Sequence, residues 1–115
     1  EGIHVKIAIL NNTYLGMVRQ WQEMFYGERY SEVDLAGCPD YVKWAEAMGC
    51  VGIRVESVDE IDDAIALANS INDRSVVVEF RVEEFEKVFP MVPAGASNDE
   101  VLLHPNQESR REFLK

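Results

Sequence analysis

The apolar run Val5-Lys6-Ile7-Ala8-Ile9-Leu10, followed at once by Asn11-Asn12-Thr13-Tyr14-Leu15-Gly16, decides the fold of this chain. The run does not alternate between apolar and polar residues, which is typical of a strand buried on both faces of a parallel sheet. The asparagines and the loop then lead into a helix. Because this order places the loop at the carboxyl end of a sheet, where open α/β folds bind ligands, the loop is a candidate site.

The remaining chain alternates between helical and strand patterns. From Gly16 an apolar stripe recurs at helical spacing and predicts an amphipathic helix that ends at Gly27. Its members are Met17, Val18, Trp21, Met24 and Phe25. Further on we predict an irregular connection over 28–40, a short helix over about 41–48, a strand over 51–55, a helix opening at 57, a strand over 76–82 and an irregular segment over 90–97.

Local signals mark the ends of these elements. Asp40 is the expected N-cap of the short helix and Gly49 its stop. Ser57 and Glu60 have the spacing of a capping box at the start of the next helix. That helix carries its apolar residues on one face, namely Ile61, Ala64, Ile65, Ala68 and Ile71.

The order strand, helix, helix, strand, helix, strand, tail predicts an α/β fold. Only three strands can be recognised, so we expect a partial doubly wound, mostly parallel sheet. The 115 residues suffice for one domain, residues 1–115, in which 90–115 form an irregular tail. Since the chain starts abruptly and without methionine, we expect it to be part of a longer protein.

The composition restricts the partners. With a formal net charge of −10, the chain repels phosphate backbones and anionic membrane surfaces, so we expect no nucleic acid and no membrane partner. No apolar run reaches the length of a membrane span. Cys38 and Cys50 lack zinc or CxxC spacing, which favours free thiols in a reducing, intracellular setting.

Asn12 is the first candidate ligand. Its amide oxygen is a hard, neutral donor that suits Mg²⁺, and the backbone carbonyl of Tyr14 and a diphosphate could complete much of the octahedron. Two asparagines after a strand also occur as a turn or a helix cap, and no carboxylate lies in this loop. Gly16 allows a ligand close to the backbone at a helix start, or simply a flexible start.

Other side chains leave two interpretations open. The stripe of Met17, Trp21 and Phe25 is either core or the wall of a pocket. A cluster of basic and aromatic residues either meets an anionic substrate or is solvated and paired with nearby glutamates; it comprises Arg19, Arg29 and Tyr30. His4 and His104 have no acid, thiol or metal partner at a telling spacing and are interpreted as structural or surface residues.

Leu10 to Gln22, then Phe25-Tyr26 and Arg29-Tyr30-Ser31, closely resemble the catalytic (large) subunit of acetolactate synthase, also called acetohydroxyacid synthase. The block Gly16-Met17-Val18-Arg19-Gln20-Trp21-Gln22 is the most specific part of this resemblance. Pro39 to Gly49 and Phe89 to Gly95 are similar to later segments of the same family.

The resemblance implies the C-terminal part of a thiamin diphosphate-binding domain, with thiamin diphosphate and Mg²⁺ as cofactors. In such an enzyme pyruvate is decarboxylated and joined to a second pyruvate or to 2-oxobutyrate, in branched-chain amino-acid biosynthesis. It implies that the metal is bound by Asn12 and the Tyr14 carbonyl, that Leu15, Gly16 and Met17 lie beside the cofactor, and that Met17 and Trp21 shape the substrate pocket. The segment Pro90–Ser97 would close over the site.

The chain also departs from the family pattern. It contains no Gly-Asp-Gly, so the metal carboxylate is missing, and the segments that activate the thiazolium or hold FAD are absent too. The resemblance thus implies half of a cofactor site, with no catalytic residue in this chain and no activity of the chain alone.

The same resemblance implies partners: the rest of the catalytic subunit, further copies in a homo-oligomer, a regulatory small subunit and small 2-keto acids. The expected location is the cytoplasm, or the plastid in a plant. Two alternatives stay open, another thiamin diphosphate-dependent decarboxylase or oxidase, and a noncatalytic remnant of the fold.

Overall fold

The computed structural model describes residues 2–104, and the chain divides between Phe85 and Glu86 into two compact units. Within the described residues, every helix and strand lies in the first unit. No helix in this described part is long and apolar enough to cross a membrane.

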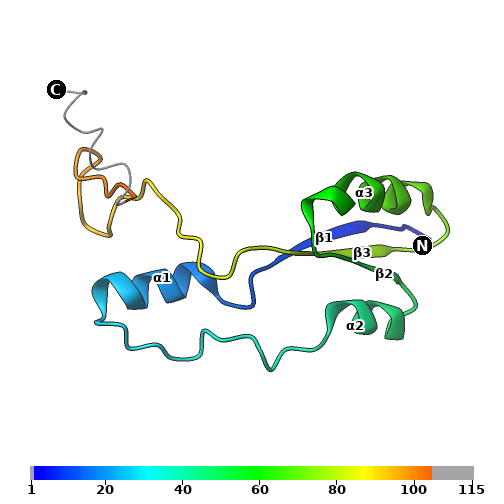
Figure 1. The fold of residues 1–115 in the computed structure, drawn as a ribbon, viewed down its shortest axis with the longest axis horizontal. Coiled ribbons are helices and arrows are strands. Elements are labelled where there is room, and N and C mark those ends of the chain that lie inside the picture. Colours follow the sequence, from blue (N-terminus) through cyan, green and yellow to red (C-terminus); the bar gives the residue numbers. More distant parts are fainter. Residues whose placement is uncertain (1, 105–115) are drawn as a thin grey trace. The chain divides into compact units, whose positions relative to one another are not determined.

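The first unit is built on a three-stranded parallel sheet (Figure 1). Its strands are β1 (Lys6–Asn11), β2 (Val51–Val55) and β3 (Val76–Arg81), in the spatial order β1-β3-β2. Phe80 of β3 is in register with Leu10 on one side and Val55 on the other. The sequence-based expectation of an α/β fold with a parallel sheet is therefore confirmed.

Two helices cover opposite faces of the sheet (Figure 1). Helix α3 (Ile61–Ser70), preceded by the 3-10 turn Val58–Glu60, buries Ala64 and Ala68 against Val76 and Val78 of β3. Helix α2 (Tyr41–Ala47) packs on the other face, where Gly52 of β2 meets its backbone. Because side chains alternate along a strand, odd-numbered positions of β3 face α2 and even-numbered ones face α3.

The residues predicted to cap or end the helices do so in the structure. The Asp40 carboxylate accepts the N–H groups of Val42 at 3.0 Å and Lys43 at 3.1 Å and so caps α2. Ser57 and Glu60 form the reciprocal capping box before α3. Gly49 follows α2 with a φ of 76°, a conformation that glycine adopts without steric cost.

Burial of β1 on both faces, as predicted from its apolar run, is wrong for this structure. Ile7 is 42% exposed and Leu10 72% exposed, whereas Val77, the β3 residue in register with Ile7, is 2% exposed. The reason is topological, since β1 is an edge strand and the helices that pack on the sheet cover β2 and β3. The apolar run predicted a strand correctly but not what covers it.

Helix α1 (Gly16–Phe25) has the predicted extent, but its stripe is not core. Met17, Val18 and Phe25 stand exposed, and the buried residue of the helix is Gln20. The following connection runs back along α1, where the Gln22 side chain binds both backbone groups of Ser31, at 3.1 and 3.2 Å. Helix α3 also has one residue of its predicted apolar face in solvent, because Ile65 is exposed while Ala64 and Ala68 are buried.

The second unit has no helix and no strand in its described part, residues 86–104. Met91 and Leu102 form an isolated antiparallel bridge, and Phe89 packs edge-to-face on His104 at 5.5 Å between ring centroids. The predicted irregularity of 90–97 is confirmed, and the structural interpretation of His104 agrees with this contact. The rest of the predicted tail, 105–115, lies outside the described residues.

Candidate functional site

The loop between β1 and α1 is held by the connection that returns toward α2. Leu15 N–H donates to the Val33 carbonyl at 2.9 Å, and Leu35 N–H donates to the Thr13 carbonyl at 2.8 Å. Thr13 has a φ of 61°, a left-handed conformation that costs a β-branched residue about 1–2 kcal/mol. The Thr13 hydroxyl also donates to Glu84 at 3.1 Å. These bonds hold the loop in a conformation that the local sequence disfavours.

The two asparagines differ in their hydrogen bonds. Asn11 uses both ends of its amide: the nitrogen donates to Glu79 at 2.5 Å and the oxygen accepts the Thr13 N–H at 2.9 Å. The Asn12 oxygen accepts the Tyr14 N–H at 3.4 Å, beyond the usual range for such a bond. In residues 2–104 no other hydrogen bond to the Asn12 side chain or to the Tyr14 carbonyl is found. Both oxygens can therefore accept a ligand.

Gly16 brings the Asn12 amide against the start of α1. A Cβ atom at Gly16 would lie 2.7 Å from Asn12 Nδ2, so the close approach requires glycine. Leu15 occupies the N-cap position of α1, and no side chain caps the N–H groups of the first turn. Free N–H groups at a helix start attract anions such as a diphosphate.

Met17 and Trp21 line a groove along α1 with a volume of about 610 Å³, together with Val18, Gln22, Tyr26 and Arg29. Of the three stripe residues named in the sequence analysis, Met17 and Trp21 lie at this groove, and Phe25 is not among the residues that line it. Trp21 is steadied by a tilted contact with Phe25, with ring centroids 5.0 Å apart.

The structure brings Arg19 into a cage of aromatic rings. Its guanidinium carbon lies 5.1 Å from the ring centroid of Tyr14, 4.9 Å from that of Tyr30 and 4.5 Å from that of Phe85. An ion pair with Glu23 at 3.6 Å completes its surroundings. Of the two sequence interpretations, Arg19 therefore follows the paired one. The rings come from three separate segments, so no spacing in the sequence could have shown the cage.

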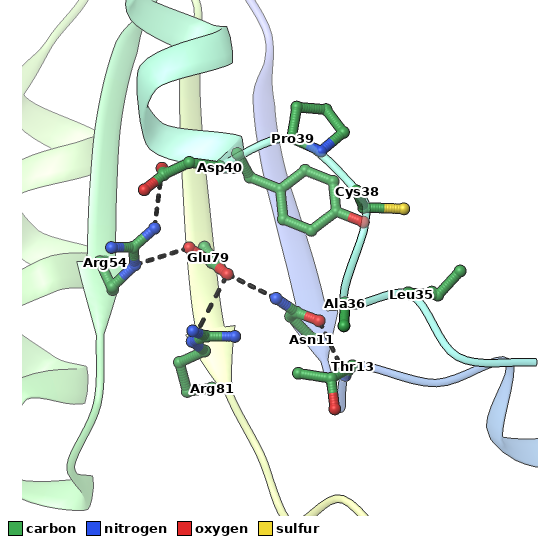
Figure 2. A pocket seen from close by; sticks show the side chains of 11 residues that line it. Asn11, Thr13, Leu35, Ala36, Cys38, Pro39, Asp40, Arg54, Glu79 and Arg81 are labelled. Atoms are coloured by element: carbon green, nitrogen blue, oxygen red, sulfur yellow. Dashed lines mark hydrogen bonds and ion pairs between the residues drawn. The ribbon is translucent and has the colours of Figure 1, made fainter.

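Sequence reasoning missed a polar pocket at the carboxyl ends of the strands (Figure 2). Its volume is about 380 Å³ and its walls include Asn11, Asp40, Arg54, Glu79 and Arg81. The Glu79 side chain, only 2% exposed, accepts from Arg54 at 2.8 Å and from Asn11 on the other oxygen. The only available signal was a lone acidic residue inside the apolar strand β3.

The charges of this pocket are paired. Arg54 donates to Asp40 at 2.8 Å as well as to Glu79, and Arg81 lies 3.7 Å from Glu79. The Arg54 side chain, followed by the N–H of Lys43, holds the pKa of Asp40 below its usual value. Burial, followed by the neighbouring Cys38, raises the pKa of the Tyr41 hydroxyl. Cys38 and Cys50 are free thiols, as predicted.

The donor set of the loop fits one side of a metal and diphosphate site. Asn12 and Tyr14 contribute neutral oxygens, which suit Mg²⁺, beside an uncapped helix start. Across the described residues, no group of three or more His, Cys, Asp or Glu side chains could hold a metal ion.

The sequence that forms this strand, loop and helix lies within a segment that matches a known family. Residues 1–80 match the family described as thiamine pyrophosphate enzyme, C-terminal TPP binding domain, and the chain belongs to this family. Within it, the chain is similar to acetolactate synthases. It is 55% identical over 105 residues to the acetolactate synthase large subunit of Mycobacterium tuberculosis, covering 88% of this chain and 17% of the relative.

Two further relatives carry related names. Identity is 50% over 105 residues to the acetolactate synthase large subunit of Corynebacterium glutamicum, with 88% of this chain and 17% of the relative covered. It is 42% over 99 residues to the acetolactate synthase isozyme 2 large subunit of Escherichia coli, with 85% and 18% covered. The chain thus spans less than a fifth of the length of these relatives. The family resemblance predicted from the Gly16–Gln22 block is confirmed.

Proposed function

We propose that this chain is part of the catalytic subunit of an acetolactate synthase and contributes one side of its cofactor site. The observation that carries the proposal is the contrast between the two asparagines. Asn11 is held by two strong hydrogen bonds, while Asn12 keeps its amide oxygen available beside an uncapped helix start. The similarity to acetolactate synthases over 88% of the chain supports the same reaction class.

In this proposal Asn12 Oδ1 and the Tyr14 carbonyl bind Mg²⁺, and Leu15, Gly16 and Met17 lie beside thiamin diphosphate. When bound, the coenzyme supplies carbanion stabilisation after loss of carbon dioxide from pyruvate. The chain orients and encloses it: the strained Thr13 presents the two oxygens, and Gly16 leaves room for close approach. The Gly-Asp-Gly half of the motif, the metal carboxylate and the FAD-binding parts would belong to other segments.

The groove along α1 is proposed as the substrate wall. Met17 and Trp21 offer an apolar surface for the methyl or ethyl group of the second 2-keto acid, pyruvate or 2-oxobutyrate. Arg29, at the same groove, offers a cation for a carboxylate. This cation offsets locally the repulsion expected from a net charge of −10.

We further propose that residues 1–115 form the C-terminal portion of the cofactor-binding domain, with 90–115 as its tail. The proposed partners are the rest of the catalytic subunit, further copies in a homo-oligomer and a regulatory small subunit. The proposed location is the cytoplasm, or the plastid in a plant, and the pathway is branched-chain amino-acid biosynthesis.

The direct test replaces Asn12 in the complete subunit. Asn12→Ala should raise the half-saturating Mg²⁺ concentration at least about 100-fold, because even residues that only support metal ligands cost about 10–100-fold. Calorimetric titration of Mg²⁺ at saturating thiamin diphosphate measures the shift. Asn69→Ala, an exposed asparagine on α3, is the matched control and should change nothing. An unchanged Mg²⁺ requirement in Asn12→Ala would refute the proposed site.

Trp21 separates a synthase from another thiamin diphosphate enzyme. In competition between pyruvate and 2-oxobutyrate, Trp21→Leu should change the product ratio, because the side chain walls the groove. Trp44→Leu, on the exposed side of α2, should leave the ratio unchanged. An unaltered ratio in both variants would favour a decarboxylase or oxidase. The isolated chain should form no acetolactate from pyruvate, and clear formation would show that the missing segments are dispensable.

A further inference from the structure

A continuous path of polar contacts joins the start of α2 to the loop after β1 (Figure 2). Asp40 caps α2 and accepts from Arg54 at 2.8 Å, and Arg54 donates to Glu79 at 2.8 Å. Glu79 in turn accepts from Asn11 at 2.5 Å, and Asn11 accepts the Thr13 N–H at 2.9 Å. The next residue along from Asn11 is Asn12.

The centre of this path is a buried charge in an apolar strand. Glu79 follows Val76, Val77 and Val78, all buried, and its own side chain is 2% exposed. Burying a carboxylate is unfavourable unless it is paired and hydrogen-bonded, and an apolar residue would serve the sheet at least as well. The fold alone therefore does not explain a glutamate here.

Glu79 determines which way the Asn11 amide points. An ionised carboxylate can only accept hydrogen bonds, so Asn11 must turn its NH₂ group toward Glu79. Its oxygen is then directed to the Thr13 N–H, where it supports the turn with a φ of 61°. With the amide reversed, two oxygens would face each other at Glu79, and the NH₂ group would face the Thr13 N–H.

We propose that Glu79 is a positioning residue for the cofactor loop: acting through Asn11, it holds the turn at Thr13 that presents Asn12 Oδ1 and the Tyr14 carbonyl to the metal. This role rests on the function proposed above. Glu79 does not touch the metal, and it acts from the strand beside β1, in register with Ile9. Arg54 and Asp40 hold the carboxylate from its other oxygen and connect it to α2.

The test measures Mg²⁺ binding by calorimetry in the complete subunit at saturating thiamin diphosphate, together with the melting temperature. Glu79→Gln and Asn11→Ala should each raise the half-saturating Mg²⁺ concentration about tenfold, the scale for residues that orient metal ligands. The double variant should have the same half-saturating Mg²⁺ concentration as Asn11→Ala alone, because both substitutions act on the same hydrogen bond between Asn11 and Glu79. Asn11→Ala keeps the test valid if Glu79→Gln folds poorly, since it leaves the charges of the pocket paired.

Val77→Ala is the matched control. Val77 lies on the same strand and the same face as Glu79 and is equally buried, but it makes no polar contact with its side chain. It should lower the melting temperature without changing the Mg²⁺ requirement. The positioning role would be overturned if Asn11→Ala bound Mg²⁺ like the wild type. It would also be overturned if Glu79→Gln, like the control, changed only the melting temperature. The positioning role would also be overturned if the double variant raised the half-saturating Mg²⁺ concentration by the product of the two single-variant increases.

The same titration separates this role from the proposed function. If Asn12→Ala weakens Mg²⁺ binding while Asn11→Ala and Glu79→Gln do not, only the positioning role fails. If Asn12→Ala itself binds Mg²⁺ like the wild type, the metal site fails, and the positioning role fails with it.

Discussion

Helices α1 and α3 are ten residues long and both are amphipathic, yet they use their apolar faces differently. Helix α3 buries Ala64 and Ala68 against the sheet, whereas α1 leaves Met17 and Val18 exposed along a groove. Helical spacing therefore shows which residues share a face, but not whether the protein core or a ligand covers that face.

The two helices are also attached differently. Small residues on α3 allow close contact with β2 and β3, so α3 is held by apolar packing. Helix α1 is held by polar and aromatic contacts instead, with Gln22 bound to Ser31 and Arg19 enclosed by rings. Such attachment secures the helix while its apolar face stays open to the groove.

The largest expected effect is on the packed side of the molecule, at Gly52. A Cβ atom there would lie 2.7 Å from the Val42 carbonyl oxygen and 2.9 Å from Val42 Cα, so α2 would have to move away from β2. We expect Gly52→Ala to reduce the free energy of unfolding by about 3 kcal/mol, the upper range for overpacking. Urea denaturation followed by circular dichroism measures the loss.

Gly37→Ala is the control for that experiment, because nothing lies within 4 Å of a Cβ at Gly37. Its urea unfolding midpoint should equal that of the wild type within experimental error. Equal stability of the two variants would contradict the packing of α2 against β2.

A pair of valines compares the two regions directly. Val76→Ala removes a fully buried side chain under α3 and should cost about 2 kcal/mol through lost burial and the cavity left behind. Val18→Ala removes one that is 49% exposed on α1 and should stay within about 0.5 kcal/mol. A large loss for Val18→Ala in chemical denaturation would mean that the α1 stripe is core after all.

Arg19 tests how α1 is attached. Arg19→Met keeps the length of the side chain but removes the charge from among the rings, and we expect a loss of about 1 kcal/mol in stability. Arg74→Met, at an exposed arginine, removes the same charge without a ring contact and serves as control. If the two variants melt alike, the ring cage contributes nothing.

The smallest effect concerns acid stability. The Arg54 side chain keeps the pKa of Asp40 below its value in the unfolded chain. The unfolded state therefore binds the proton more readily, so this contribution is complete above a pH of about 4 and is lost as the pH falls further. Asp40→Asn should flatten the decline of stability below that pH. Titration of the unfolding midpoint between acid and neutral pH measures the slope, and identical slopes would exclude the contribution.

Local features explain why much of the fold could be predicted. The capping box at Ser57, the cap at Asp40 and the stop at Gly49 depend on residues a few positions apart, and each is present in the structure. The strand over 76–82 was recognised from its apolar content, yet the role of Glu79 within it was missed. Its partners, Asn11 and Arg54, come from two other strands, and a single sequence does not show which strands are neighbours.

The sequence alone determined the family of this chain, the helices and strands, and the loop that carries Asn12 and Tyr14, because these depend on short-range patterns and on a specific block of residues. Only the tertiary structure decided that β1 is an exposed edge, that the α1 stripe lines a groove, and that Glu79 and Arg19 have the partners they do. Segments far apart in the sequence must meet before an apolar side chain is buried or a charged side chain is paired, so burial and pairing depend on the tertiary structure.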